Sequence, residues 1–76
     1  MLVSTQVRMA RAALGLSVRE LAQRTGIADS TILRFETGRG GILAANLNRL
    51  QEVLEESGVA FISAGPDGGA GVRLKA

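Results

Sequence analysis

The chain has 76 residues, 46% of them hydrophobic, and this size and composition are typical of a single small folded domain. It has no uncharged apolar run near the roughly 20 residues that a membrane helix needs, and its N-terminus lacks the pattern of a signal peptide. Cysteine and histidine are both absent, which argues against disulfides, zinc sites and the usual nucleophile and base of enzymes. We therefore expect a cytoplasmic protein that is not an enzyme, does not contact membranes and binds neither metal nor cofactor.

The net charge of +2 is unevenly distributed along the chain. Residues 1–41 carry six arginines against three acidic residues, whereas residues 42–76 carry three basic residues against four acidic ones, so the two parts have charges of +3 and −1. Eight of the nine basic residues are arginine, whose planar guanidinium binds phosphates and guanine edges through two parallel hydrogen bonds. The N-terminal part is therefore the candidate for contact with a polyanion.

Two helices are predicted in the first part of the chain. The first begins at a cap formed by Ser4 or Thr5 and ends at Gly15. The second begins at a capping box, in which Ser17 and Glu20 satisfy each other's backbone amides, and it ends near residue 25.

A tight turn with Gly26 connects the second helix to a third, predicted over Ser30 to Thr37 and ended by Gly38. The third helix has polar residues on one side and the apolar pair Ile32 and Phe35 on the other. Two short helices joined in this way have the geometry that places the second one in the major groove of DNA.

The rest of the chain is predicted to form one more helix and a hairpin. Leu43, Leu47, Leu50 and Leu54 recur at steps of four, three and four, which predicts a fourth helix that ends at Gly58. Residues 59–62 and 72–74 are rich in β-forming residues and are separated by a turn-forming segment. The expected fold is mainly α, with a helical core at residues 4–57 and a β-hairpin at residues 59–75 in a single domain of residues 1–76.

The stretch RMARAALGLSVRELAQRTGIADSTILRFETGRG resembles the phage-repressor and Cro type of helix-turn-helix protein, the Xre family. The resemblance covers residues 7 to about 57. Its marks are LGLS before the second helix, ELA within it, Gly26 in the turn, Ile32 in the third helix, and Glu36 with Gly38 at its end. It implies a repressor-like four-helix fold in which Ala22 lets the two helices cross closely and Ile32 fills the core.

The resemblance also implies which residues contact DNA. Arg34 is the main candidate for base contact, because it can donate two hydrogen bonds to guanine O6 and N7. We expect base contacts from Asp29, Ser30, Leu33 and Arg34, base or phosphate contacts from Thr31 and Thr37, and phosphate contacts from Ser17, Arg19, Arg24 and Arg39.

Other positions are implied to be architectural or depart from the family pattern. Arg11 and Glu36 match the family's buried ion pair. The position of a phosphate-binding glutamine in the second helix is Val18, and the usual serine cap of the third helix is Ala28. Asp29 is therefore either the cap of the third helix or a base contact.

The hairpin is more apolar than a free tail needs, and a two-stranded sheet is marginal in water with its edges uncovered. We predict a homodimer in which Phe61, Ile62, Val72 and Leu74 contribute to a shared sheet. The alternative is a hairpin that packs on the fourth helix of its own chain.

Together these features predict a sequence-specific regulator of transcription at the nucleoid. It would bind double-stranded DNA as a dimer at an inverted-repeat operator and act as a repressor. The alternative is a protein-interaction adaptor, or the antitoxin of a toxin pair, that uses the same fold and holds a protein partner through the hairpin.

Overall fold

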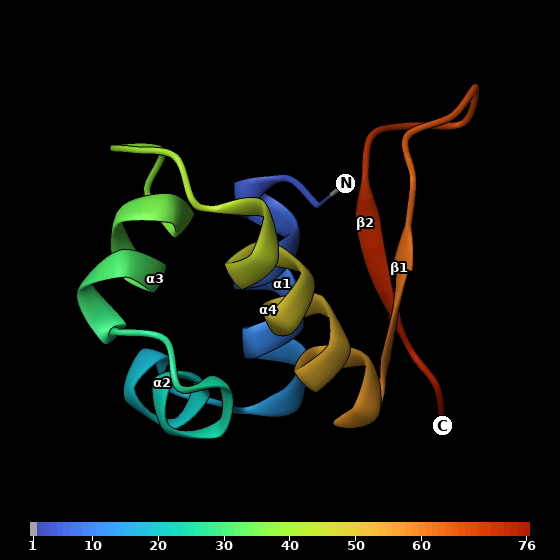
Figure 1. The fold of residues 1–76 in the computed structure, drawn as a ribbon. Helices are drawn as coiled ribbons and strands as arrows, with labels where there is room; N and C mark the ends of the chain where they lie inside the picture. The colour runs from blue at the N-terminus through green and yellow to red at the C-terminus, as the bar shows by residue number, and fades with distance from the viewer. Residues whose placement is uncertain (1) are drawn as a thin grey trace.

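A computed structural model describes residues 2–76, which form four helices followed by a two-stranded antiparallel hairpin (Figure 1). This confirms the mainly helical fold with a C-terminal hairpin. No helix within this range is both long and apolar enough to span a membrane. The elements are α1 (Ser4–Leu14), α2 (Val18–Thr25), α3 (Asp29–Glu36), α4 (Ala44–Glu56), β1 (Val59–Ile62) and β2 (Gly71–Leu74).

Helices α1 and α4 lie in the middle of the molecule, with the α2–α3 pair on one side and the hairpin on the other (Figure 1). One hydrophobic core connects all three parts. Its fully buried side chains include Leu21 of α2, Ile32 of α3, Leu50 and Leu54 of α4, and Val59 of β1. The same two central helices therefore support both the α2–α3 pair and the hairpin.

The predicted capping box of α2 is confirmed. The backbone N–H of Glu20 donates to Ser17 Oγ and the N–H of Ser17 donates to Glu20 Oε1, both at 3.0 Å. The predicted glycine ends are also present, since Gly15 and Gly26 have φ of 68° and 75°, a left-handed conformation that favours glycine. Both ends of α2 are thus specified by local sequence.

The predicted start of α1 is wrong, because Val3 is the N-cap and Ser4 is already helical. The N–H of Val3 donates to the side-chain oxygen of Gln6 at 3.0 Å. Gln6 is buried, and its amide nitrogen donates a hydrogen bond to the carbonyl of Ile62 in the C-terminal hairpin. The side chain of Gln6 therefore satisfies the backbone at this helix end and also contacts the hairpin, and neither hydroxyl caps α1.

Helix α4 begins one residue later than its leucine pattern indicates. Leu43 is the N-cap, has extended backbone and is 73% exposed, so it does not belong to the buried face. The other three leucines of the stripe are buried as predicted, together with Val53. Leu43 fits the helical spacing but lies before the first helical turn.

The hairpin packs on its own chain, against α1 as well as α4. Phe61 and Val72 are paired across the strands and contact the core. The amide nitrogen of Gln6 donates to the carbonyls of Ile62 and Gly71, another paired couple, at 3.0 and 3.1 Å. The intrachain alternative is therefore present, with α1 as an additional support.

Of the four hairpin residues expected at a dimer interface, two are used within the chain. Phe61 and Val72 are half-buried against the core, whereas Ile62 and Leu74 are 39% and 52% exposed. Of these four residues, Ile62 and Leu74 are therefore the ones most accessible to a second copy.

Candidate nucleic-acid interface

The turn between α2 and α3 is held by a residue that the sequence analysis did not single out. Thr25, the last residue of α2, is buried, and its hydroxyl donates to the carbonyl of Leu21 at 2.8 Å. The same hydroxyl accepts from the N–H of Ile27 at 3.2 Å, beyond the left-handed Gly26. With Leu21, Ile27 and Ile32 buried beneath it, the turn fixes the orientation of α3 relative to α2.

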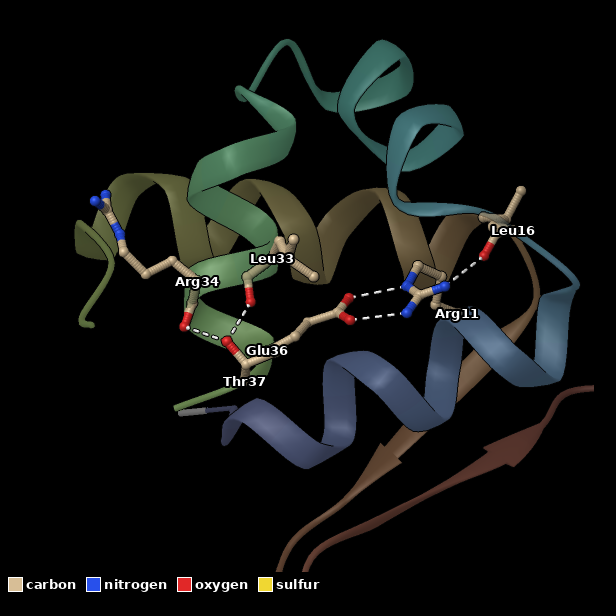
Figure 2. A network of polar contacts seen from close by, with 6 residues as sticks. All are labelled: Arg11, Leu16, Leu33, Arg34, Glu36 and Thr37. Atoms are coloured by element: carbon tan, nitrogen blue, oxygen red, sulfur yellow. Dashed lines mark hydrogen bonds and ion pairs between the residues drawn. The ribbon is translucent and has the colours of Figure 1, made fainter. Parts of the chain in front are cut away.

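An ion pair on the inner side of α3 connects this helix to α1. Arg11 Nε and Nη2 donate to the two carboxylate oxygens of Glu36 at 2.9 and 2.8 Å (Figure 2). Arg11 also donates to the carbonyl of Leu16 at 3.1 Å, in the loop before α2. The Glu36 side chain is only 1% exposed, so this is the buried pair that the family resemblance implied.

The electrostatics of this pair favour its charged form. Hydrogen bonding to Glu36 raises the pKa of Arg11, outweighing the lowering that partial burial causes. The two parallel hydrogen bonds also fix the direction of both side chains. Glu36 is thereby committed to the interior and leaves the opposite side of α3 free for other contacts.

The remaining surface of α3 carries the expected base-contact residues. Asp29, Ser30, Leu33 and Arg34 are all exposed, Leu33 to 52%. Figure 2 shows the guanidinium of Arg34 on the side of α3 opposite the Arg11–Glu36 pair. All four residues are therefore accessible on a short helix that the ion pair holds in place.

The structure excludes Asp29 as the N-cap of α3. Helix α3 begins at Asp29, and Ala28 occupies the N-cap position without a side-chain hydrogen bond. Asp29 is thus the first helical residue, and the prediction that it is the cap is wrong. Its carboxylate lies in the first turn of α3, where the helix dipole favours a negative charge.

Thr31, within α3, and Thr37, at its end, differ in accessibility. Thr31 is half-buried, whereas Thr37 is exposed at the C-terminal end. The hydroxyl of Thr37 donates to the carbonyl of Leu33 at 2.8 Å, with the carbonyl of Arg34 also close at 3.3 Å (Figure 2). With its proton used inside the helix, Thr37 can offer an outside partner only an acceptor oxygen.

The four residues expected to contact phosphates are all exposed, but one of them is hydrogen-bonded within the chain. Ser17, Arg19 and Arg39 lie on the surface, with Ser17 at the start of α2 and Arg39 after α3. Arg24 is also exposed, but its guanidinium donates to Ser57 Oγ at 3.3 Å, at the C-terminal end of α4. In this conformation Arg24 is directed toward α4.

Arg34 stands between two surface hollows. The loop after α3 and the start of α4 line one of them, and the exposed side of α3 lines the other. Of the residues that line the first hollow, the sequence analysis named Thr31 and Arg34 as DNA contacts. It assigned Leu43 to the fourth helix, because that residue fits the helical spacing. The residues beside Arg34 in the first hollow are Thr31, Gly41, Ile42, Leu43 and Asn46, and those in the second are Ser30, Leu33, Thr37 and Arg39.

Comparisons with known proteins agree with this geometry. A search of curated proteins found no match to the chain. Residues 3–60, well over half of the chain, match the protein family described as Helix-turn-helix domain. The match includes all four helices and the first residues of β1. The chain therefore belongs to the helix-turn-helix domain family and is a DNA-binding domain of that class.

Proposed function

We propose that this protein is a sequence-specific transcriptional regulator of the Xre type, which binds an inverted-repeat operator as a dimer and represses. The observation that carries the proposal is the exposed surface of α3, which includes Arg34 and which the buried Arg11–Glu36 pair supports from inside. A helix that is braced on one side and polar on the other is suited to enter a major groove.

In this proposal the side chains of α3 read bases. The guanidinium of Arg34 donates two parallel hydrogen bonds to guanine O6 and N7, a contact that discriminates by about 1–3 kcal/mol. Leu33 contacts a thymine methyl group, and Ser30 and Asp29 reach base edges from the first turn. Asp29, as an acceptor, selects a cytosine N4 amino group.

Backbone contacts surround this face. Arg19 and Arg39 bind phosphates, and Ser17 and Thr31 offer their hydroxyl protons. Thr37, whose free oxygen is only an acceptor, contacts a donor group of a base instead. Each arginine that neutralises a phosphate releases counterions, so binding weakens as salt increases. Arg24 joins this group by leaving Ser57, a contact of 3.3 Å at the surface.

A dimer suits this mode of binding, because two recognition helices about 34 Å apart enter successive major grooves. The support for a dimer is the hairpin, where Ile62 and Leu74 are exposed and each strand has a free edge. A second copy would cover both.

The central test is a selection of bound duplexes from random sequence at two salt concentrations, followed by binding of the selected site to variants. We expect Arg34→Ala to lose discrimination at one guanine while its thermal unfolding matches that of the unchanged protein. The matched control is Arg8→Ala, which removes an exposed arginine of α1 away from α3. Undiminished affinity of the Arg34→Ala protein for the selected site would remove Arg34 from the interface.

The dimer is tested separately by equilibrium sedimentation. Truncation before the hairpin is unsuitable, because it removes Val59 from the core and the two partners of Gln6. We expect Ile62→Lys to shift the protein toward monomer, while Asn48→Lys, on the exposed side of α4, leaves the dimer intact. If the unchanged protein sediments as a monomer at all concentrations, the dimer proposal fails.

A further inference from the structure

The side chain of Arg34 rests on the loop that follows α3. A Cβ atom added to Gly40 would lie 3.2 Å from Cγ and Cδ of Arg34 and 3.3 Å from its Nε. These distances are shorter than ordinary van der Waals contacts, so a side chain at residue 40 requires the Arg34 side chain to move by a few tenths of an ångström. The neighbouring Gly38 and Gly41 have nothing within 4 Å of an added Cβ.

Backbone conformation does not require glycine at residue 40. Gly38 has φ of 71° and needs the freedom of glycine, but Gly40 is not among the glycines with positive φ. Alanine can therefore adopt the backbone of Gly40. The methyl group of an alanine at residue 40 would contact the aliphatic part of the Arg34 side chain.

The loop is also tied to Arg34 through the backbone. The N–H of Arg39 donates to the carbonyl of Arg34 at 2.9 Å, and the N–H of Gly38 donates to that of Phe35 at 3.1 Å. This pair of bonds, with the left-handed Gly38, is the Schellman arrangement that turns the chain back over the helix end. It brings Gly40 against the side chain of the same residue whose carbonyl anchors the turn.

From these contacts we infer that Gly40 is a specificity-determining residue, which positions the guanidinium of Arg34 for base recognition by leaving room for its stem. The inference rests on the proposed DNA-binding function. A Cβ at residue 40 displaces the Arg34 stem by a few tenths of an ångström, because a flexible side chain yields more readily than the backbone. Two parallel hydrogen bonds to a guanine edge depend on direction, so this displacement weakens discrimination more than general affinity.

The experiment compares Gly40→Ala with Gly41→Ala by measuring affinity for the selected duplex and for the same duplex with the Arg34-dependent guanine pair replaced. We expect Gly40→Ala to reduce the ratio of the two affinities about fivefold, a part of the full value of a bidentate contact. Gly41→Ala adds a methyl group to the same loop in open space and should leave the ratio unchanged.

A double variant separates positioning from a general effect on the loop. In an Arg34→Ala background, Gly40→Ala should change neither affinity, because its effect passes through the arginine side chain. In the free protein, nuclear Overhauser contacts between the Arg34 side chain and the α-protons of Gly40 should be present before DNA is added.

The outcomes distinguish the two proposals. If the unchanged protein shows no salt-sensitive, sequence-selective binding, the proposed function fails and this inference fails with it. If it binds and Arg34→Ala loses discrimination, but Gly40→Ala equals Gly41→Ala or acts equally in the double variant, only the inference is overturned.

Discussion

The two sides of the central α1–α4 pair are fastened by different chemistry. On one side, the charged pair of Arg11 and Glu36 holds α3 with hydrogen bonds of 2.9 and 2.8 Å. On the other side, the neutral amide of Gln6 holds the hairpin with hydrogen bonds of 3.0 and 3.1 Å. The first attachment supports a face for another molecule, whereas the second closes the core of the chain itself.

The comparison shows that residue type does not decide role in this protein. Arg11 and Arg34 are both arginines on helices, but Arg11 is paired with a buried carboxylate whereas Arg34 is exposed on the surface. Disrupting the charged attachment and disrupting the neutral one should also lower the free energy of unfolding by different amounts. Removing one member of an ion pair leaves a buried charge, whereas removing an amide leaves carbonyls that water can partly solvate.

The largest effect should come from breaking the ion pair. Arg11→Ala leaves the carboxylate of Glu36 buried without a partner, and we expect a loss of about 3–5 kcal/mol in the free energy of unfolding. Urea denaturation at neutral pH measures it. Because Glu36 is 1% exposed, its charge cannot be solvated without moving α3.

The double variant Arg11→Met with Glu36→Met is the control, since it replaces both charges by apolar groups of similar length and should restore most of the lost stability. Arg34→Ala should stay within about 0.5 kcal/mol of the unchanged protein, as surface substitutions usually do. Equal losses for Arg11→Ala and Arg34→Ala would contradict the distinction between the two arginines.

Breaking the neutral attachment should cost less. Gln6→Leu removes both donors to the hairpin carbonyls and the acceptor for Val3, and we expect a loss of about 1–3 kcal/mol. A hollow lined by Gln6, Phe61 and Ser63 gives water access to this region, which keeps the loss below that of Arg11→Ala. Hydrogen exchange should show faster exchange in β1 and β2 than in α2 and α3.

Gln6→Glu adds a pH test of the same contact. It keeps an acceptor for the N–H of Val3 but turns a carboxylate toward two carbonyl oxygens, which raises the pKa of the new group in the folded state. A raised folded pKa means that stability falls as pH rises above the ordinary glutamate pKa of 4.5. The deficit relative to the unchanged protein should therefore be smaller at pH 4 than at pH 7, and an equal deficit at both would contradict the contact.

Features coded by neighbouring residues were predictable from the sequence. The capping box of Ser17 and Glu20, the left-handed Gly26 and the two strands all match, because each depends on residues within a few positions. The ion pair between α1 and α3 spans 25 positions and followed only from the family resemblance.

Features set by tertiary contacts were not predictable in this way. The bonds from Gln6 to the hairpin join residues 56 and 65 positions apart, and no local pattern indicates such a contact. Leu43 satisfies helical spacing but lies outside α4. In the candidate site, helical periodicity indicated which residues of α3 are exposed, whereas the contact between Gly40 and Arg34 depends on the path of one side chain over a loop.

A smaller effect is expected at the start of α2, which belongs to neither attachment. Ser17→Ala removes the acceptor for the N–H of Glu20, and loss of such a cap costs about 1 kcal/mol. The change should appear as a lower midpoint of urea denaturation with an unchanged slope. Ala28→Ser is the converse variant, because it supplies α3 with the side-chain acceptor that its N-cap lacks, and it should raise the midpoint.

The smallest effect should be a pH dependence from the same capping box. The backbone hydrogen bond from Ser17, followed by that to its side chain, lowers the pKa of Glu20 below its ordinary value of 4.5. A lowered folded pKa contributes stability above the unfolded value, and this contribution is lost as pH falls through the folded pKa. Glu20→Gln keeps a side-chain acceptor but does not titrate, so the stability difference between the two proteins should shrink as pH is lowered below 4.5. A difference that stays constant from neutral pH to pH values well below 4.5 would show that the glutamate charge contributes nothing to the cap.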